Sequence, residues 1–592
     1  MKQVITVGRT NKVLNSLFVI LFASALFSLH FLALEHASSN FINYDRHALF
    51  VILILIGVFF LFRKFYCGVT LRTIIVGMFS LYIALGAHLT NRQEYISLAL
   101  IFFLIFNVIR QLFVKNRWIF FHCFVVANLV TAILYLTDKH LFDFLDYLSS
   151  NSSINTGLNA NYFASITPFC LSFFFGRKFI LRHKIFLCLN ILLLIFSIVI
   201  IVESHSRISW LAILITVPFT VLWLCRTITF QRIFANYINL WLLTIIFVFF
   251  CYFLYQFNPK SVQGRFLIYK VSFYLIKSNL VLGCGPGGFS SNYNLWQAKY
   301  FAKNSNDSQN DQLLAANTYE SFNEPLRILA EYGIIGSVIL FLIILVTIVG
   351  IKKRKLNFYC MGAVGSLLSV LICGLMSYPL SLYSVLINII FFFSTLPYKE
   401  NRLIVLDKIT NYQVIFKISF LAWCLYLGYA QLQVAKSERR WSRAALLGLE
   451  GNFSAANTEF KACYRYLKYD GRFMFDYGSE LSYANQNKES IKVLKIAANL
   501  YPNDQIFINL GDTYQAIGDF SKALESYKMA RYIFPSRFSS RYKKLKLCEK
   551  IGAHADAFAE AQEIMSLPVK IPSGDIDFMK MQASSYIEKH GK

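Results

Sequence analysis

Three short segments of the sequence combine arginine with residues that can accept a proton or hold a polar ligand. They are Ser206–Trp210, which directly follows His205, then Gly264–Phe266, and finally Phe322–Arg327. Arginine is permanently charged and can direct two hydrogen bonds at one phosphate group. A carboxylate or an imidazole can act as a general base. These segments are therefore the candidates for a site that binds an anion and moves a proton.

A glycine-rich segment, Leu282–Phe289, lies between the second and third of these segments. Its residues Gly283, Gly285 and Gly288 satisfy the G-x-G-x-x-G spacing of dinucleotide-binding turns. That motif needs a strand before it and a helix after it, and Pro286 interrupts the match. We reject the dinucleotide interpretation. The glycines instead predict a tight turn that lets the backbone approach another segment closely.

The amino-acid composition indicates that most of the chain lies within a membrane. Of its 592 residues, 56% are hydrophobic, 17% are aromatic and only 15% are charged. A soluble domain cannot cover so much apolar surface, and the apolar runs have the length of about 20 residues that a spanning helix needs. The net charge of +26 is explained by cations in cytoplasmic turns rather than by nucleic-acid binding. The 12 cysteines contain no C-x-x-C pair, so neither a disulfide framework nor a zinc site is indicated.

The apolar runs predict about twelve or thirteen spans, of which the first, Val13–Leu34, is an uncleaved N-terminal helix. The other predicted spans are centred near Leu55, Met78, Phe103, Val126, Thr167, Leu193, Leu214, Phe247, Leu340, Leu368, Ile389 and Trp423. Clusters of lysine and arginine follow the even-numbered spans, for example Lys352–Lys355. The positive-inside rule then predicts a cytoplasmic N-terminus. The long loop from Phe257 to Glu324 and everything beyond Leu432 are expected outside the cytoplasm.

The C-terminal tail has a different, polar and periodic pattern. Its best repeat places Leu510, Gly511, Tyr514, Ala523 and Tyr527 at signature positions of the 34-residue tetratricopeptide repeat. We predict an all-α protein in which a polytopic helix bundle precedes an α-helical tetratricopeptide-like solenoid. The expected domains are N-terminal spans at 1–150, a membrane core at 151–432 with a large loop at 257–326, and repeats at 433–592.

Ordered along the chain, the polar segments resemble the bacterial O-antigen ligase-like family. The features that carry the resemblance are Gly157–Ala164, Ser206–Arg207 with Trp210, Gly264–Arg265, the glycine-rich turn, and Asn323 through Gly336. They cover roughly residues 156–396. The family uses polyprenyl-diphosphate-linked glycans and includes O-antigen ligases, O-antigen polymerases and protein O-oligosaccharyltransferases. The resemblance implies an inverting, metal-independent glycosyltransferase without a cofactor, in the bacterial cytoplasmic (inner) membrane and with periplasmic repeats.

The resemblance also implies roles for individual residues. Arg207 and Arg265 match the family's phosphate-binding arginines, and their alternative role is to anchor helices at the membrane interface. Asn323 and Arg327 are further candidates for substrate binding. Many members carry histidine immediately before the asparagine, where this chain has Phe322.

That departure leaves the general base open. Glu324 is the first candidate, Glu320 the second and His205 the third. Glu331 has the alternative role of capping or pairing near a helix, and Gly333 and Gly336 are expected to be packing positions.

The donor expected from the resemblance is a glycan on undecaprenyl diphosphate, and lipid A–core oligosaccharide is the default acceptor. A protein acceptor or a growing polymer are alternatives within the same family. The tail is expected to offer a binding surface for a protein partner. From other classes, a glycolipid transporter or flippase would need charges lining a path through the spans. An inactive scaffold is the third hypothesis.

Overall fold

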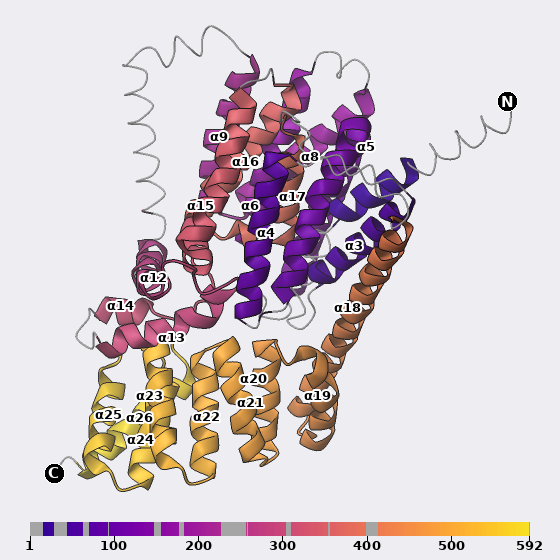
Figure 1. The fold of residues 1–592 in the computed structure, drawn as a ribbon. Helices are drawn as coiled ribbons and strands as arrows, with labels where there is room; N and C mark the ends of the chain where they lie inside the picture. Colours follow the sequence, from indigo (N-terminus) through magenta and orange to yellow (C-terminus); the bar gives the residue numbers. More distant parts are fainter. Residues whose placement is uncertain are drawn as a thin grey trace, which may run out of the picture. The chain divides into compact units, whose positions relative to one another are not determined.

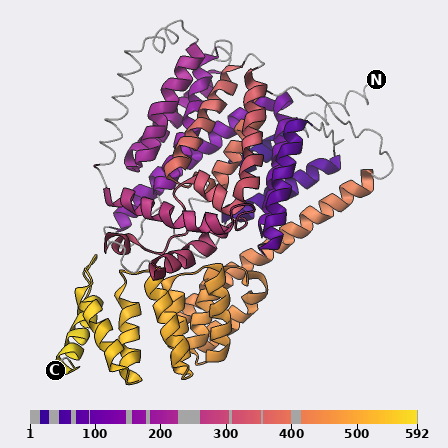
Figure 2. The same ribbon diagram turned by 60° about the vertical axis from the view of Figure 1, so that its left-hand side comes forward.

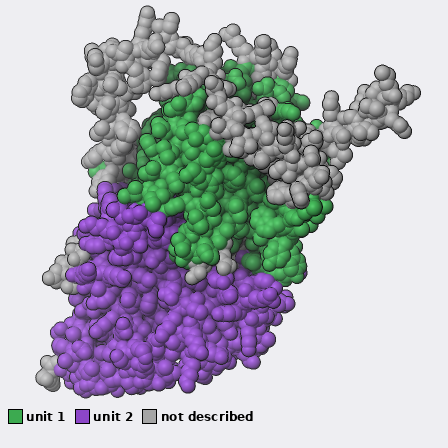
Figure 3. Space-filling model, in the orientation of Figure 1, with its two compact units in different colours: residues 1–256, 322–328, 334–435 green, residues 257–321, 329–333, 436–592 purple. Residues whose placement is uncertain are grey.

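The protein is described by a computed structural model, and every element of regular structure in its described part is helical (Figure 1). The described residues are 16–28, 44–62, 70–90, 92, 94–146, 156–176, 183–225, 256, 259–303, 309–352, 356–397 and 413–590. The prediction of an all-α membrane protein is confirmed. The chain forms two compact units, which we describe separately (Figure 3).

The described helices agree well with the predicted spans. Eight are long and apolar enough to cross a membrane, and four shorter apolar helices of 10–17 residues accompany them. Each of these twelve helices covers a predicted span, and the span predicted near Phe247 lies outside the described residues. The spans around Phe103 and Val126 form one element, α5 (Glu94–Asp146), whose backbone is non-helical at Asn116.

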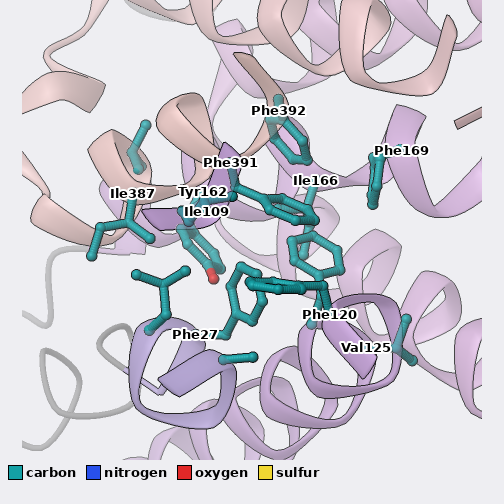
Figure 4. Packing of buried hydrophobic residues seen from close by; sticks show 14 of the residues in the cluster. Phe27, Ile109, Phe120, Val125, Tyr162, Ile166, Phe169, Ile387, Phe391 and Phe392 are labelled. Carbon is teal, nitrogen blue, oxygen red and sulfur yellow. The ribbon is translucent and has the colours of Figure 1, made fainter. Parts of the chain in front are cut away.

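The first unit comprises residues 1–256, 322–328 and 334–435. Its helices are α3 (Tyr44–Phe62), α4 (Leu71–Leu89), α5, α6 (Thr156–Ser172), α8 (Lys184–Glu203), α9 (Arg207–Cys225), most of α15 (Glu324–Lys352), α16 (Phe358–Met376), α17 (Tyr383–Thr395) and the first part of α18 (Gln413–Leu449). Its core is largely aromatic. The centroid of the Phe391 ring lies 5.0 Å from that of Phe27 and 5.6 Å from that of Phe169 (Figure 4). It also lies 5.6 Å from the centroid of the Phe124 ring.

Small residues on α16 let it approach α6 and α9 closely. A Cβ atom at Gly362 would collide with Ser172 of α6, and one at Gly365 would collide with Thr220 of α9. Close approach through small residues is a usual device of helix packing in membranes. Pro168 interrupts the hydrogen bonding of α6, and the hydroxyl of Ser366 on α16 accepts the N–H of Phe169 at 3.1 Å. These three helices form the framework for the candidate site.

The second unit comprises residues 257–321, 329–333 and 436–592. Its loop helices are α12 (Pro259–Ser278), α13 (Gly288–Lys303) and α14 (Gln309–Leu314). Its tail helices are α19 (Phe453–Leu467), α20 (Gly471–Tyr483), α21 (Asn487–Leu500), α22 (Asp504–Ala516), α23 (Phe520–Ile533), α24 (Phe538–Lys550), α25 (His554–Ser566) and α26 (Gly574–His590). The loop helices and the tail thus belong to one compact body.

Consecutive tail helices pack side by side in pairs (Figure 2). The helices that begin these pairs start at Gly471, Asp504 and Phe538, so successive pairs are offset by 33 and 34 residues. Gly511 lies against the ring of Tyr527 and leaves no room for a Cβ atom. The helical tail and its period agree with the sequence. Its assignment to tetratricopeptide repeats, and the domain boundaries at 150 and 432, stay predictions.

Candidate active site

The turn between α8 and α9 presents the first candidate arginine. Arg207 is the first residue of α9, and its side chain is half-buried. His205 precedes it in the left-handed region, with a φ of 51°, and is exposed. The indole N–H of Trp210 donates at 2.8 Å to the carbonyl of Ile201 near the end of α8, and the hydroxyl of Ser204 donates to the same carbonyl at 2.8 Å. The turn is therefore fixed from both of its helices.

A buried polar chain links this turn to α6 and α16. Asn161 of α6 is 1% exposed and accepts a hydrogen bond from the hydroxyl of Ser209 on α9 at 2.8 Å. The hydroxyls of Ser209 and Ser206 are 2.8 Å apart, which extends the chain to the residue before Arg207. On its other side, the amide of Asn161 donates to the hydroxyl of Ser377 at 2.7 Å, just beyond α16. Asn161, which lies in the segment Gly157–Ala164, thus has a structural role that the sequence left undefined.

The segment Asn323–Arg327 is attached to the same connection between α16 and α17. The carboxylate of Glu324 accepts the N–H of Leu380 at 2.7 Å. Arg327 pairs with Glu324 at 2.7 Å and also donates to the hydroxyl of Ser381 at 2.9 Å. The amide of Asn323 donates to the carbonyl of Leu375 at 3.0 Å.

The connection between α16 and α17, residues 377–382, thus serves as a hub. We call this six-residue segment the hub, and it includes the 3-10 turn η2 (Pro379–Ser381). Ser377 of the hub is hydrogen-bonded to Asn161, which connects it to the Arg207 turn. Leu380 and Ser381 of the hub are hydrogen-bonded to the Glu324 segment. Sequence reasoning missed the hub. Its only signal is the polar and proline-containing stretch Ser377–Ser381 between two apolar spans.

Phe322 directly precedes Asn323, at the position where the sequence resemblance leads us to expect histidine. It has a φ of 52°, and its ring packs edge-on against Tyr378 of the hub, with 5.0 Å between centroids. Left-handed backbone at a residue other than glycine is uncommon and costs energy. The rest of the site therefore holds Phe322 in place, and its aromatic ring serves as an anchor on the hub.

The side chain of Glu324 is held by contacts with Arg327 and with the hub. This side chain is buried, with Arg327 and the Leu380 N–H on its oxygens, and Gly374 leaves little space beside it. These two contacts hold the carboxylate of Glu324 in one orientation.

The backbone of the glycine-rich turn packs directly against the backbone of α15, at the point where α15 is kinked. Gly333 has φ 61° and ψ −165° within α15, and Gly283 has φ 75°. A Cβ atom on either glycine would collide with the backbone of the other segment. The N–H of Gly285 donates to the carbonyl of Glu331 at 2.9 Å, and the Glu331 carboxylate accepts the N–H of Phe289 at 3.4 Å. The predicted tight turn and the packing role of Gly333 are confirmed, and Glu331 caps the start of α13.

The candidate residues are divided between the two units. His205, Arg207, Asn323, Glu324 and Arg327 belong to the first unit, and Arg265 and Glu320 belong to the second. Arg265 lies on α12 and Glu320 in the stretch before α15, and both side chains are half-buried. Among the described residues, no three His, Cys, Asp or Glu side chains are grouped as a metal site requires.

A comparison with protein families identifies the middle of the chain. Residues 192–341 match the family described as O-antigen ligase, and all seven candidate residues lie in this range. The chain carries an O-antigen ligase-family domain. No curated protein matches the sequence. The sequence-based resemblance to the O-antigen ligase-like family is thus confirmed.

Several residues that support the site lie outside the O-antigen ligase match. The match covers most of α8, all of α9 and α12–α14, and the first part of α15. Asn161 and the hub lie outside it on either side. The arginine turn and the Glu324 segment of the O-antigen ligase domain are therefore held in place by helices that the match does not include.

Proposed function

We propose that this protein transfers a glycan from undecaprenyl diphosphate to an acceptor on the outer side of the cytoplasmic membrane. The O-antigen ligase domain supports glycosyl transfer in general. The observation that carries the proposal further is the hub, because it ties Arg207 and the Asn323–Arg327 segment to one short connection. A cationic turn and a carboxylate would thus be available to one substrate.

In the proposed reaction, an acceptor hydroxyl attacks the anomeric carbon of the donor sugar. The bond between that carbon and the diphosphate oxygen breaks, and the diphosphate leaves with the electron pair while the base takes the hydroxyl proton. Attack opposite the leaving group inverts the anomeric configuration. We assign the diphosphate to Arg207 and Arg265, since a guanidinium can direct two hydrogen bonds onto phosphate oxygens. One such charge pair is worth about 4 kcal/mol at 4 Å and an effective dielectric constant of 20, before desolvation.

Arg207 has a further advantage as a phosphate ligand. It begins α9, and the N-terminus of a helix attracts anions through its free N–H groups and its dipole. We propose Glu324 as the base, followed by Glu320 and His205. Contacts in the resting protein do not rule out a base, because catalytic hydrogen bonds commonly form only with substrate present. Asn323 and Arg327 are proposed to border the donor.

The proposed sidedness is supported by the second unit. Its loop helices α12–α14 and its tail form one compact body, which supports placing them on one side of the membrane. The distribution of lysine and arginine favours the periplasm for that side. Lipid A–core oligosaccharide is the default acceptor, and a protein or a growing polymer would use the same chemistry.

Two experiments test the proposal. Purified full-length protein in nanodiscs is expected to convert a lipid-linked oligosaccharide donor and an acceptor into glycosylated product, and no product would contradict it. In cells, deletion of the gene should remove long lipopolysaccharide ladders if lipid A–core is the acceptor. Loss of protein glycans would instead indicate an oligosaccharyltransferase, and single-unit products would indicate a polymerase. Donor accumulation on the cytoplasmic leaflet would favour a flippase.

A further inference from the structure

Two amide side chains of the loop helix α13 are buried against the tail. Asn294 and Gln297 are 0% and 1% exposed. Asn294 donates to the carbonyl of Pro502, just beyond α21, at 2.8 Å, and Gln297 donates to the carbonyl of Ile533, the last residue of α23, at 2.6 Å. Carbonyls at helix ends lack partners within their own helix. One loop helix thus donates hydrogen bonds at the C-terminal ends of α21 and α23, the second helices of two successive tail pairs.

The same two amides also hold the stretch of loop that follows α14. Asn294 accepts the N–H of Thr318 at 2.9 Å, and Gln297 donates to the carbonyl of Ala316 at 3.1 Å. Each amide therefore joins three parts of the second unit, namely α13, a tail helix end and the stretch after α14. Because they are buried, loss of either amide would leave backbone groups without partners.

This stretch has two more contacts with the tail. Asn317 donates to the carboxylate of Asp504 at 2.7 Å and accepts the N–H of Asp504 at 3.3 Å. Asp504 is fully buried at the start of α22 and pairs with Arg537 at 2.8 Å. The ring of Tyr319 stacks on that of Tyr501, with centroids 4.2 Å apart and planes 6° apart. Consecutive residues 316–319 are therefore all fixed, and Glu320 follows directly.

A second set of contacts connects the tail-bound helix α13 to the helix that carries Arg265. Tyr300 of α13 contacts Tyr274 of α12, with 5.6 Å between ring centroids. Lys270 of α12 lies 5.1 Å from the same ring and pairs with Asp311 of α14 at 3.2 Å. The loop helices α12, α13 and α14 thus form one packed group, and its attachment to the tail runs through Asn294 and Gln297.

We propose that the tail is a positioning element of the transferase and not only a surface for a separate partner. It holds α13 and residues 316–319, and through them Glu320 and the helix of Arg265. This inference rests on the proposed function, because it assigns those two residues to transfer. It follows that the rate of transfer depends on the bond between loop and tail even for an acceptor too small to touch the repeats.

The test uses full-length protein in nanodiscs with a lipid-linked donor and a minimal acceptor. Asn317→Asp places a second carboxylate beside Asp504 and should lower kcat about tenfold or more, the range that coupled neighbours reach. The exchanged pair, Asn317→Asp with Asp504→Asn, restores one donor and one acceptor and should recover most of the activity. Asn509→Asp is the matched control, since Asn509 bonds within the tail to Ser479 at 2.8 Å. It should keep kcat close to that of the unmodified protein.

Hydrogen exchange supplies a readout that does not depend on activity. Asn317→Asp should accelerate exchange in residues 315–321 and leave α24–α26 unchanged, whereas general destabilisation would accelerate both. Unchanged kcat in Asn317→Asp would overturn the inference, whether or not exchange is accelerated, as would failure of the exchanged pair to recover activity. No transfer by the unmodified protein would contradict the proposed function, and exchange would still decide whether the tail holds the loop.

Discussion

The amide of Asn161 donates a hydrogen bond to the hydroxyl of Ser377 at 2.7 Å, across 216 positions of the sequence. Asn161 also accepts from Ser209, and so it lies between the hub and the turn that carries Arg207. A buried amide with partners on both sides is costly to remove, because its partners stay buried without hydrogen bonds. This one side chain therefore links the Arg207 turn to the hub.

We expect Asn161→Ala to reduce transfer by about tenfold or more while the protein still inserts and folds, since buried unsatisfied groups cost about 1–3 kcal/mol. Transfer by purified protein and its elution in size-exclusion chromatography are the measurements. Asn190→Ala is the matched control, because Asn190 is equally buried but donates to the carbonyl of Cys170 at 2.8 Å, away from the hub. If both variants lose activity equally, the specific role of Asn161 is wrong.

The helices could be predicted from the sequence because their signal is local. Apolar runs of span length predict the membrane helices without knowledge of their neighbours, and the repeat pattern around Gly511 and Tyr527 predicts the tail helices in the same way. The close approach at the glycine-rich turn was also predictable, since glycine is the residue that permits it. The segment that it approaches, at Gly333, was not.

The contacts that assemble the site could not be predicted, because they join neutral polar residues far apart in the chain. Asparagine and serine in apolar helices have no charge pattern or periodicity that indicates a partner. Nothing in the sequence therefore indicates that Asn161 and Ser377 are partners. Likewise, Asn317 and Asp504 lie in regions that the sequence assigns to separate domains, and only their packing brings them together.

The charge and the shape of the candidate arginines can be tested separately. Arg207→Ala and Arg265→Ala should each abolish detectable transfer, since both remove a cation from the proposed diphosphate site. Arg207→Lys keeps the charge but loses the planar pair of donors, so we expect it to retain a small part of kcat. Steady-state kinetics with varied donor concentration are the measurement. Arg439→Ala, at an exposed position of α18, is the control and should be fully active. Full activity of both alanine variants would remove the assignment.

The assignment of Glu324 as base predicts a loss that depends on its charge. Glu324→Gln keeps an oxygen that can accept the Leu380 N–H but cannot take up a proton, so transfer should be lost across the whole pH range. Ser381→Ala removes a hydrogen-bond acceptor of Arg327 and should keep most of the activity. The pH dependence of kcat for both variants is the measurement. An active Glu324→Gln variant would transfer the assignment to Glu320 or His205, which the same assay tests with Glu320→Gln and His205→Ala.

Two glycine-to-alanine variants, one at the contact between the glycine-rich turn and α15 and one away from it, are expected to change stability in opposite directions. Gly333→Ala places a Cβ atom against the carbonyl of Val281 in a conformation that is essentially restricted to glycine. It should destabilise the second unit by more than about 1–3 kcal/mol. Gly264→Ala, in α12, meets no atom within 4 Å and should stabilise by about 0.5–1 kcal/mol. Thermal unfolding measures both, and a neutral Gly333→Ala variant would contradict this contact.

The tail contains a carboxyl group whose pKa makes stability depend on pH. Burial raises the pKa of Asp476 on α20 from 3.8 to about 6, although the indole N–H of Trp441 donates to it at 3.0 Å. Asp470 and Arg472 also act on it, and Asp476 in turn helps to raise the pKa of Glu480.

Because the folded protein holds the Asp476 proton more tightly than the unfolded chain does, this contribution to stability is complete below pH 4. It is lost as the pH rises through about 6, and it amounts to at most about 3 kcal/mol.

Asp476→Asn keeps an acceptor for Trp441 but has no charge to bury. At pH 7.5 it should be more stable than the unmodified protein, and at pH 4.5 the difference should shrink. Pulse proteolysis of the tail in the intact protein at both pH values is the measurement. Asp519→Asn, at a position whose carboxylate pairs with Lys522 at the surface, should show no such gain at pH 7.5, and an equal gain there would mean that burial of Asp476 is not the cause.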